Sequence, residues 1–196
     1  WPLPDRSDPA LHEIFDAFES RLTRLLEARL TTEELWVVKD PRTALLLPSW
    51  LAVLRQLEVQ PRFVVVHREA AANCRSFVSK GQVPWLWAEA LWQRTYTEIF
   101  RHSDVSRLLI YFRSLQRDPL ACCERMAAFL EHQPCNGWQE AIHKAVNPNL
   151  QHPLQAQTGD DEPNCTSLTL SMQERLERGD STEGLVHGEE SLLAST

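Results

Sequence analysis

The chain has 196 residues, 43% of them apolar, which is enough for one globular domain with a proper core. Its formal net charge of -7 argues against a general nucleic-acid binder, because such proteins normally carry a basic surplus. The apolar stretch at 45–54 contains Pro48 and is too short to span a bilayer, so we expect no membrane span.

The five cysteines include no pair with CxxC spacing, and the histidines show no metal-ligand spacing. This pattern argues against a disulfide framework and against a zinc site. We therefore expect reduced thiols, a cytoplasmic location and no bound metal.

The first predicted element is a helix over residues 8–30. Asp8-Pro9 opens it with a capping carboxylate and a proline at the first helical position. Apolar residues then recur at the spacing of one helix face, as in an amphipathic helix. They are Leu11, Ile14, Phe15, Phe18, Leu22, Leu25, Leu26 and Leu30.

Three short β-rich runs follow, at residues 35–39, 62–67 and 107–112. Each is continuously apolar rather than alternating, as expected for parallel strands that are covered on both faces. Asp40-Pro41 and Asp118-Pro119 repeat the helix-start signal after the first and third runs. Strands and helices therefore alternate, which predicts an α/β fold with a parallel sheet sandwiched by helices.

Further helices are predicted at 86–101, 119–131 and 137–146. After Pro153 the composition shifts toward Gln, Thr, Asp, Glu, Ser and Gly. We therefore assign residues 1–152 to the α/β domain and residues 153–196 to a polar, mobile tail that contains a short helix at 168–178.

Basic side chains gather at the predicted strand exits. Open parallel sheets bind ligands at the carboxyl ends of their strands, where helices also present free backbone N–H groups. One strand-exit cation by itself is best explained as reaching solvent, whereas several in one crevice favour an anion site. The side chains concerned are Lys39, Arg42, His67, Arg68 and Arg113.

The exit of the 62–67 run carries the most specific pattern. Arg68 follows the run directly, and Ser76 lies eight residues later in the next predicted helix. The paired N–H donors of an arginine guanidinium and a serine hydroxyl at this spacing can bind a phosphate from two sides. The alternative for Ser76 is an ordinary helix residue, since its match to Arg68 is the only support for a binding role.

Several segments resemble the PAPS-dependent sulfotransferase family, and most closely its bacterial-type branch with a KDPR signature. The resemblance covers residues 33–152 and implies a P-loop-like fold. The matching segments are Lys39-Asp40-Pro41-Arg42 with Leu45-Leu46-Leu47-Pro48-Ser49-Trp50, the pair Arg68 and Ser76, Leu108-Leu109-Ile110-Tyr111-Phe112 with Asp118-Pro119, and Val146-Asn147-Pro148-Asn149-Leu150.

The resemblance implies an enzyme that transfers a sulfuryl group from PAPS to a hydroxyl or amine of a small molecule or glycan. Lys39 would contact the transferring group, and Arg42 would orient the acceptor or the sulfate, or pair with Asp40. Arg68 and Ser76 would hold the 3′-phosphate of PAPS. Asp40 is better explained as a helix cap than as a catalytic base, because Asp-Pro is what a capped helix start requires.

One part of the family pattern is missing. Family members begin with a strand and a Gly-rich loop that cradles the 5′-phosphosulfate with backbone N–H groups. None of the six glycines here follows an N-terminal strand, so the first strand and its loop are absent. Because the chain also starts abruptly at Trp1, we interpret it as a fragment of a longer enzyme and expect it to bind PAPS poorly.

Two other functions stay open. A catalytically inactive, sulfotransferase-like interaction domain would account for the missing loop and the acidic tail. Another P-loop-related transferase, such as a small-molecule kinase, would share the sheet but would need a Walker loop and a magnesium-binding carboxylate.

Two further sets of side chains have a structural and a functional interpretation. His67 has the pKa of a general base, but its place at the end of a buried strand favours a hydrogen-bonded structural role. Trp85, Trp87 and Trp92 could line an acceptor pocket, but their helical spacing favours core positions.

Overall fold

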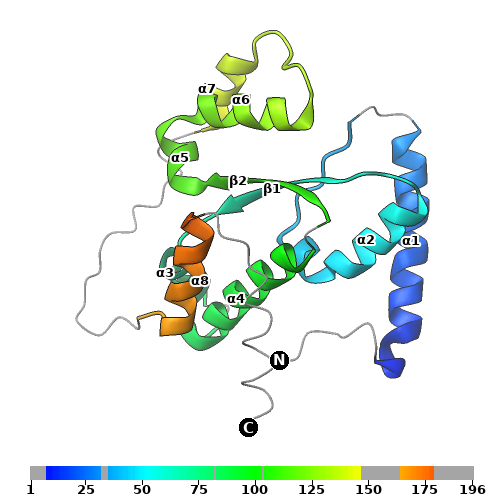
Figure 1. The fold of residues 1–196 in the computed structure, drawn as a ribbon, viewed down its shortest axis with the longest axis horizontal. Coiled ribbons are helices and arrows are strands. Elements are labelled where there is room, and N and C mark those ends of the chain that lie inside the picture. Colours follow the sequence, from blue (N-terminus) through cyan, green and yellow to red (C-terminus); the bar gives the residue numbers. More distant parts are fainter. Residues whose placement is uncertain (1–7, 32–34, 82, 103, 147–163, 179–196) are drawn as a thin grey trace. The chain divides into compact units, whose positions relative to one another are not determined.

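The computed structural model describes residues 8–31, 35–81, 83–102, 104–146 and 164–178. Within these ranges the protein is mixed α/β, mostly helical with a small parallel sheet, as Figure 1 shows. The mixed α/β class is therefore confirmed, while a P-loop-like sandwich stays a prediction. The elements are η1 (Pro9–Leu11), α1 (His12–Leu30), η2 (Pro41–Leu46), α2 (Leu47–Gln56), β1 (Arg62–His67), α3 (Ala70–Ser79), α4 (Trp85–Arg101), β2 (Ser106–Tyr111), α5 (Phe112–Arg117), α6 (Pro119–Leu130), α7 (Trp138–Ala145) and α8 (Ser167–Arg178).

The chain divides into two compact units. Unit 1 comprises Trp1–Pro61 and Arg94–His102, and unit 2 comprises Arg62–Gln93 and Ser103–Thr196. Helix α4 therefore gives its first half to unit 2 and its second half to unit 1.

Unit 1 contains α1 and α2, which share a small core. The Asp8 carboxylate accepts a hydrogen bond from the backbone N–H of Ala10 at 2.9 Å and starts η1, from which α1 continues. The predicted helix over 8–30 is thus confirmed. Burial of the shared apolar face drives the two helices together. The core consists of Leu22, Leu26, Val53 and Leu54, with Phe18, Leu30, Trp36, Trp50, Leu57 and Val59 packed against it.

Residues 35–40 form no strand, so the predicted β-run at 35–39 is wrong. Leu35, Val37 and Val38 are 40%, 71% and 42% exposed, which is not the burial expected of a central strand. Apolar composition gives a segment β-propensity, but a stable strand also needs a neighbour for its backbone groups. Among the residues that the structure describes, the sheet has two strands rather than the three expected.

Unit 2 is organised by the parallel pair β1 and β2. Their register sets Arg62 opposite Ser106 and His67 opposite Tyr111, so both strands end at the same edge. The predicted strand at 62–67 and the parallel arrangement are confirmed, and the strand predicted at 107–112 lies one residue earlier, at Ser106–Tyr111. In Figure 1, α6 and α7 lie on the opposite side of the strand pair from α3 and α8.

The two faces of β1 are covered unequally. Val65 is 8% exposed, whereas its neighbour Val66 is 48% exposed. Successive side chains of a strand point to opposite faces, so one face of β1 is better covered than the other. The expectation that every strand is covered on both faces is therefore wrong for β1.

The later helices were predicted in the right places. α4, α6 and α7 correspond to the helices expected at 86–101, 119–131 and 137–146, and α8 is the short helix expected at 168–178. No helix in the described ranges is long and apolar enough to cross a membrane. The rest of the predicted tail, residues 153–163 and 179–196, lies outside the described residues.

Helix α8 is packed into unit 2. Thr169, Met172 and Leu176 recur at helical spacing and are at most 3% exposed. One carboxylate oxygen of Glu89 accepts hydrogen bonds from the backbone N–H and the hydroxyl of Thr166, both at 2.6 Å, and from the Thr169 hydroxyl. This cluster fixes the start of α8 to α4.

Candidate functional site

The β1–α3 turn, defined as residues 68–70, lies where both strands end. The carbonyl oxygen of Arg68 accepts a hydrogen bond from the indole Nε1 of Trp92 at 3.3 Å. The backbone N–H of Ala70 donates to the side-chain oxygen of Gln173 at 2.9 Å. Contacts from α4 and from α8 therefore fix the turn at both ends, although both helices are far from it in sequence.

The guanidinium of Arg68 makes a cation–π contact rather than an ion pair. Its central carbon lies 5.2 Å from the ring centroid of Phe112, the first residue of α5, within the range of a cation–π contact. Arg68 is a half-buried residue, and within the described part of the chain its guanidinium makes no hydrogen bond and no ion pair.

Several other arginines have carboxylate partners. These pairs are Arg42 with Asp40, Arg62 with Glu131, Arg94 and Arg101 with Glu98, Arg113 with Glu69, and Arg178 with Glu174. A cation–π contact brings no carboxylate to the guanidinium, so the N–H donors of Arg68 have no acidic acceptor among the described residues. Arg68 therefore presents donors to a ligand in a way that these paired arginines do not.

Arg113 joins three elements at the same edge. Its Nε lies 3.1 Å from Glu69 Oε1, at the start of α3, and its Nη2 lies 3.9 Å from Glu177 Oε1, near the end of α8. All three side chains are partly exposed, so the bridge contributes little stability. The sequence predicted Arg113 as one cation of an anion site, but its charge is already matched by two carboxylates.

His67 is a buried residue of the sheet edge, only 2% exposed. Its ring lies against Trp92, at 6.1 Å between centroids, and against Tyr111, at 5.5 Å. Burial lowers the pKa of His67, and the nearby carboxylates of Glu177 and Glu69 only partly oppose this. A buried ring between two aromatic side chains agrees with a structural role, and the hydrogen bond expected for His67 stays a prediction.

Ser76 lies in α3, six residues after the first residue of the helix, Ala70. A rise of 1.5 Å per residue puts it about 9 Å along the axis from Ala70. Its carbonyl oxygen accepts a hydrogen bond from the Ser79 hydroxyl, and its side chain is half-buried. Arg68 and Ser76 thus belong to the same strand–helix connection, and their sharing of a phosphate stays a prediction.

The first turns of three helices are capped by side chains. Asp40 accepts from the N–H of Arg42 at 2.8 Å, and Asp118 accepts from the N–H of Ala121 at 3.0 Å. At the start of α3 the side-chain oxygen of Gln173 accepts a hydrogen bond from the N–H of Ala70. The expectation that these helix starts offer free N–H groups is wrong for these three donors, because the protein supplies their acceptors.

Lys39, Asp40 and Arg42 belong to unit 1. Asp40 is the helix cap predicted from the sequence. Its carboxylate also accepts hydrogen bonds from the Arg42 side chain, from Nε at 3.0 Å and from Nη2 at 2.6 Å. Hydrogen bonds from the Arg42 side chain and backbone lower the pKa of Asp40 to about 2. Of the two roles considered for Arg42, the structure contains the pairing with Asp40. Lys39 is exposed beside them.

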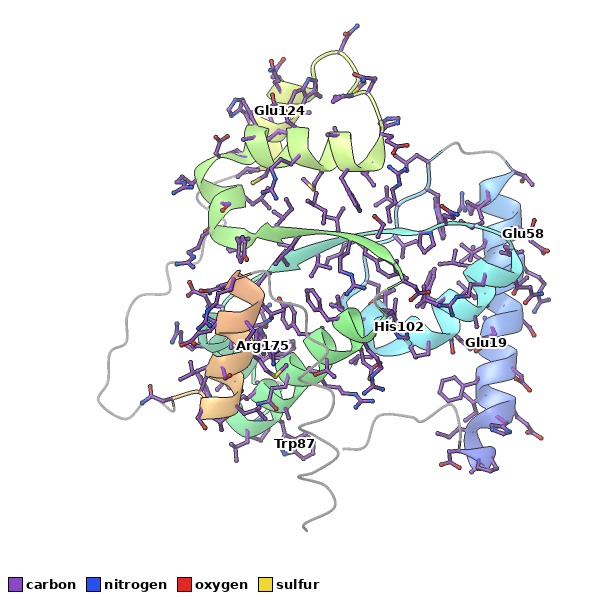
Figure 2. All side chains as sticks on the ribbon, viewed as in Figure 1. Glu19, Glu58, Trp87, His102, Glu124 and Arg175 are labelled. Carbon is purple, nitrogen blue, oxygen red and sulfur yellow. The ribbon has the colours of Figure 1, made fainter. Side chains whose placement is uncertain are left out.

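The prediction that the tryptophans of α4 occupy core positions is confirmed for one of them and wrong for another. Trp92 is 3% exposed and belongs to the core, whereas Trp87 is 52% exposed near the start of α4, where Figure 2 labels it. Helical spacing alone does not say which side of a helix is covered. No cluster of three metal-binding side chains occurs among the residues described.

Three residues of the site were not identified from the sequence. Phe112 was considered only as part of a strand, and Gln173 and Glu177 fall in the short helix predicted within the polar tail, to which no role was assigned. The end of the β2 run pointed to Phe112, since parallel strands of equal length end together. No local signal pointed to their contacts with the site, because Gln173 is 103 residues from Ala70 and Glu177 is 64 residues from Arg113.

Comparisons with protein-family models, with curated proteins and with solved structures found no match.

Proposed function

We propose that the protein is a sulfotransferase-type domain that binds PAPS through the β1–α3 turn. Arg68 and Ser76 hold the 3′-phosphate, and Lys39 contacts the sulfuryl group during transfer. The acceptor is a hydroxyl or amine of a small molecule or glycan. These roles are suggested by the place of Lys39 in the KDPR signature and by the separate match of Arg68 and Ser76 to the 3′-phosphate-binding pair of the resembled family.

The observation that carries the proposal is the state of Arg68. It is half-buried at the exit of a parallel strand, and it has no acidic partner in the ranges that the structure describes. Removing part of the hydration of a cation costs free energy unless an anion or hydrogen-bond acceptor compensates. A phosphate bound by the guanidinium fork would supply that compensation.

Sulfuryl transfer needs positioning and charge stabilisation rather than covalent chemistry from the protein. The bond between sulfur and the bridging oxygen of PAPS breaks, and a bond forms from sulfur to the acceptor oxygen or nitrogen. Adenosine 3′,5′-bisphosphate leaves, and the acceptor proton passes to a base. An ammonium group at Lys39 would stabilise the charge that develops on the leaving phosphate.

Binding is tested by titrating the isotope-labelled chain with adenosine 3′,5′-bisphosphate and with adenosine 5′-monophosphate, using NMR because weak binding is expected. The bisphosphate should bind more tightly, and Arg68→Ala should remove the difference. Arg117→Ala, which changes an exposed arginine at the end of α5, is the matched control. Equal affinity of the wild-type protein for both nucleotides would disprove the 3′-phosphate site.

The role of Ser76 has its own control in the same helix. Ser76→Ala should weaken binding of the bisphosphate, whereas Ser79→Ala, at an exposed position three residues later, should not. Equal effects of the two substitutions would assign Ser76 an ordinary helical role.

Transfer is tested with sulfur-labelled PAPS and a panel of hydroxyl and amine acceptors. Lys39→Ala should abolish transfer and leave the affinity for adenosine 3′,5′-bisphosphate unchanged, with exposed Lys80→Ala as the control. Unchanged transfer in Lys39→Ala would remove Lys39 from the proposal.

A catalytically inactive binding domain is the second candidate, and the Asp40–Arg42 pair favours it. Asp40 occupies the guanidinium fork of Arg42 in a two-point contact, which leaves Arg42 less able to orient a sulfate or an acceptor. Selective nucleotide binding without transfer to any acceptor would support this function.

A further inference from the structure

The contact between Arg68 and Phe112 follows directly from the strand register. β1 and β2 are parallel, and their last paired residues are His67 and Tyr111. Arg68 and Phe112, the residues that directly follow the two strands, therefore lie side by side where the sheet ends. The central carbon of the guanidinium lies over the Phe112 ring, 5.2 Å from the ring centroid.

The contact with Phe112 restricts the guanidinium of Arg68 without pairing it with a carboxylate. An exposed arginine side chain loses much rotamer freedom when it binds a ligand, and this loss weakens binding. The electron-rich face of Phe112 attracts the cation and limits the directions that it can take. The guanidinium carries several N–H donors, two of which can bind two oxygens of one phosphate.

The backbone of Arg68 is fixed independently of its side chain. The indole N–H of Trp92 donates to the Arg68 carbonyl oxygen at 3.3 Å. This contact holds the point from which the side chain starts, while Phe112 acts on the guanidinium at the other end. Changes at Phe112 can therefore alter the guanidinium position without removing the contact that holds the turn.

We propose that Phe112 is a positioning residue that directs the donor edge of Arg68 and so determines preference for nucleotides with a 3′-phosphate. This inference rests on the proposed function, because it assigns Arg68 to the 3′-phosphate. Phe112 acts through Arg68 and touches no reacting atom. Its contribution should therefore appear in the affinity for a 3′-phosphorylated nucleotide and disappear when that phosphate is absent.

The test is the ratio of the dissociation constants of adenosine 5′-monophosphate and adenosine 3′,5′-bisphosphate. Phe112→Leu should lower this ratio about fivefold, whereas Phe112→Tyr and Phe112→Trp, which keep an aromatic face, should retain it. Phe112→Met provides a second non-aromatic side chain of similar volume if the leucine variant does not fold. Phe77→Leu, which removes a half-buried ring from α3, should leave the ratio unchanged.

The outcomes separate this inference from the proposed function. Wild-type protein that does not distinguish the two nucleotides overturns both. Selective wild-type protein with an equally selective Phe112→Leu or Phe112→Met variant overturns the role of Phe112 alone. Equal weakening of both nucleotides by the non-aromatic variants assigns Phe112 a structural role and also overturns the inference.

Discussion

The segment 39–42 and the β1–α3 turn have a similar order of residue types along the sequence but different structures. Both place basic residues after a β-rich run and immediately before a helix. In the first, Arg42 is exposed and folds back on Asp40, two residues away. In the second, Arg68 is half-buried and is held by Phe112 and Trp92, from distant parts of the chain.

The two turns differ in where their stabilising contacts come from. In the 40–42 turn the contacts lie within the turn, whereas the β1–α3 turn depends on contacts from distant helices. Asp40 has a low pKa and satisfies both a helix N–H and an arginine, so the 40–42 turn needs no other element. The β1–α3 turn contains no internal acceptor for Arg68 and relies on α4, α5 and α8 for its shape. A turn held from outside can keep a charged group without its own counter-ion, which is what a ligand site requires.

The largest effect should follow from breaking the anchor of α8. Glu89→Ala leaves the N–H and hydroxyl of Thr166 and the hydroxyl of Thr169 without their carboxylate. We expect the free energy of unfolding to fall by about 2 kcal/mol, because unsatisfied buried groups retain their desolvation cost. Denaturant unfolding measures this free energy. The control is Glu124→Ala, on the exposed side of α6 and labelled in Figure 2, which should change the free energy of unfolding by less than about 0.5 kcal/mol.

The same anchor predicts a pH dependence. Burial would raise the pKa of Glu89, but hydrogen bonds from Thr166 and Thr169 outweigh it and lower the pKa below its usual 4.5. The stabilisation is therefore present above pH 4.5 and is lost as the pH falls through the lower folded-state pKa. Unfolding measured across this window should show a steeper loss for the wild-type protein than for Glu89→Gln, and parallel curves would contradict the anchor.

Exchanging each arginine for lysine tests the two turns directly. Arg68→Lys keeps the charge but loses the planar fork, so we expect about tenfold weaker binding of adenosine 3′,5′-bisphosphate, or about 1.4 kcal/mol. Arg42→Lys should leave the affinity unchanged because Arg42 is committed to Asp40. A larger effect of Arg42→Lys than of Arg68→Lys would reverse the comparison.

The cap on α3 should have a smaller and more local effect. Gln173→Ala removes the acceptor of the Ala70 N–H, and a neutral hydrogen bond contributes about 1 kcal/mol. Hydrogen exchange of the Ala70 amide should accelerate about fivefold, while exchange at Arg42, which Asp40 caps, should not change. Gln139→Ala, at an exposed position of α7, is the control, and unchanged exchange at Ala70 would argue against the cap.

The smallest effect on stability, but a clear spectroscopic one, is expected in the 40–42 turn. Arg42→Ala should raise the pKa of Asp40 from about 2 toward its usual 3.8, because the arginine side chain is the main cause of its depression. The stabilisation from this pair is complete above pH 3.8 and is lost as the pH falls through about 2. NMR titration of the Asp40 carboxyl carbon measures both variants, and identical midpoints would mean that Arg42 is not its partner in solution.

Local patterns in the sequence were enough to predict most elements. Proline after a capping aspartate marked the starts of η1, η2 and α6, and apolar runs marked β1 and β2. These signals succeed because a cap or a helix turn involves residues within four positions of one another. The apolar run at 35–39 failed since a strand also needs a neighbour that its own residues cannot specify.

The candidate site was predicted only in part, for the same reason. The sequence by itself placed Arg68 and Ser76 in a strand–helix connection, identified Asp40 as a cap and offered pairing with Asp40 as one role of Arg42. Only the tertiary structure brought Phe112, Trp92 and Gln173 to the β1–α3 turn and put Arg113 between two carboxylates. Those contacts arise where parallel strands end together and distant helices pack, so they depend on the register and on the core rather than on local spacing.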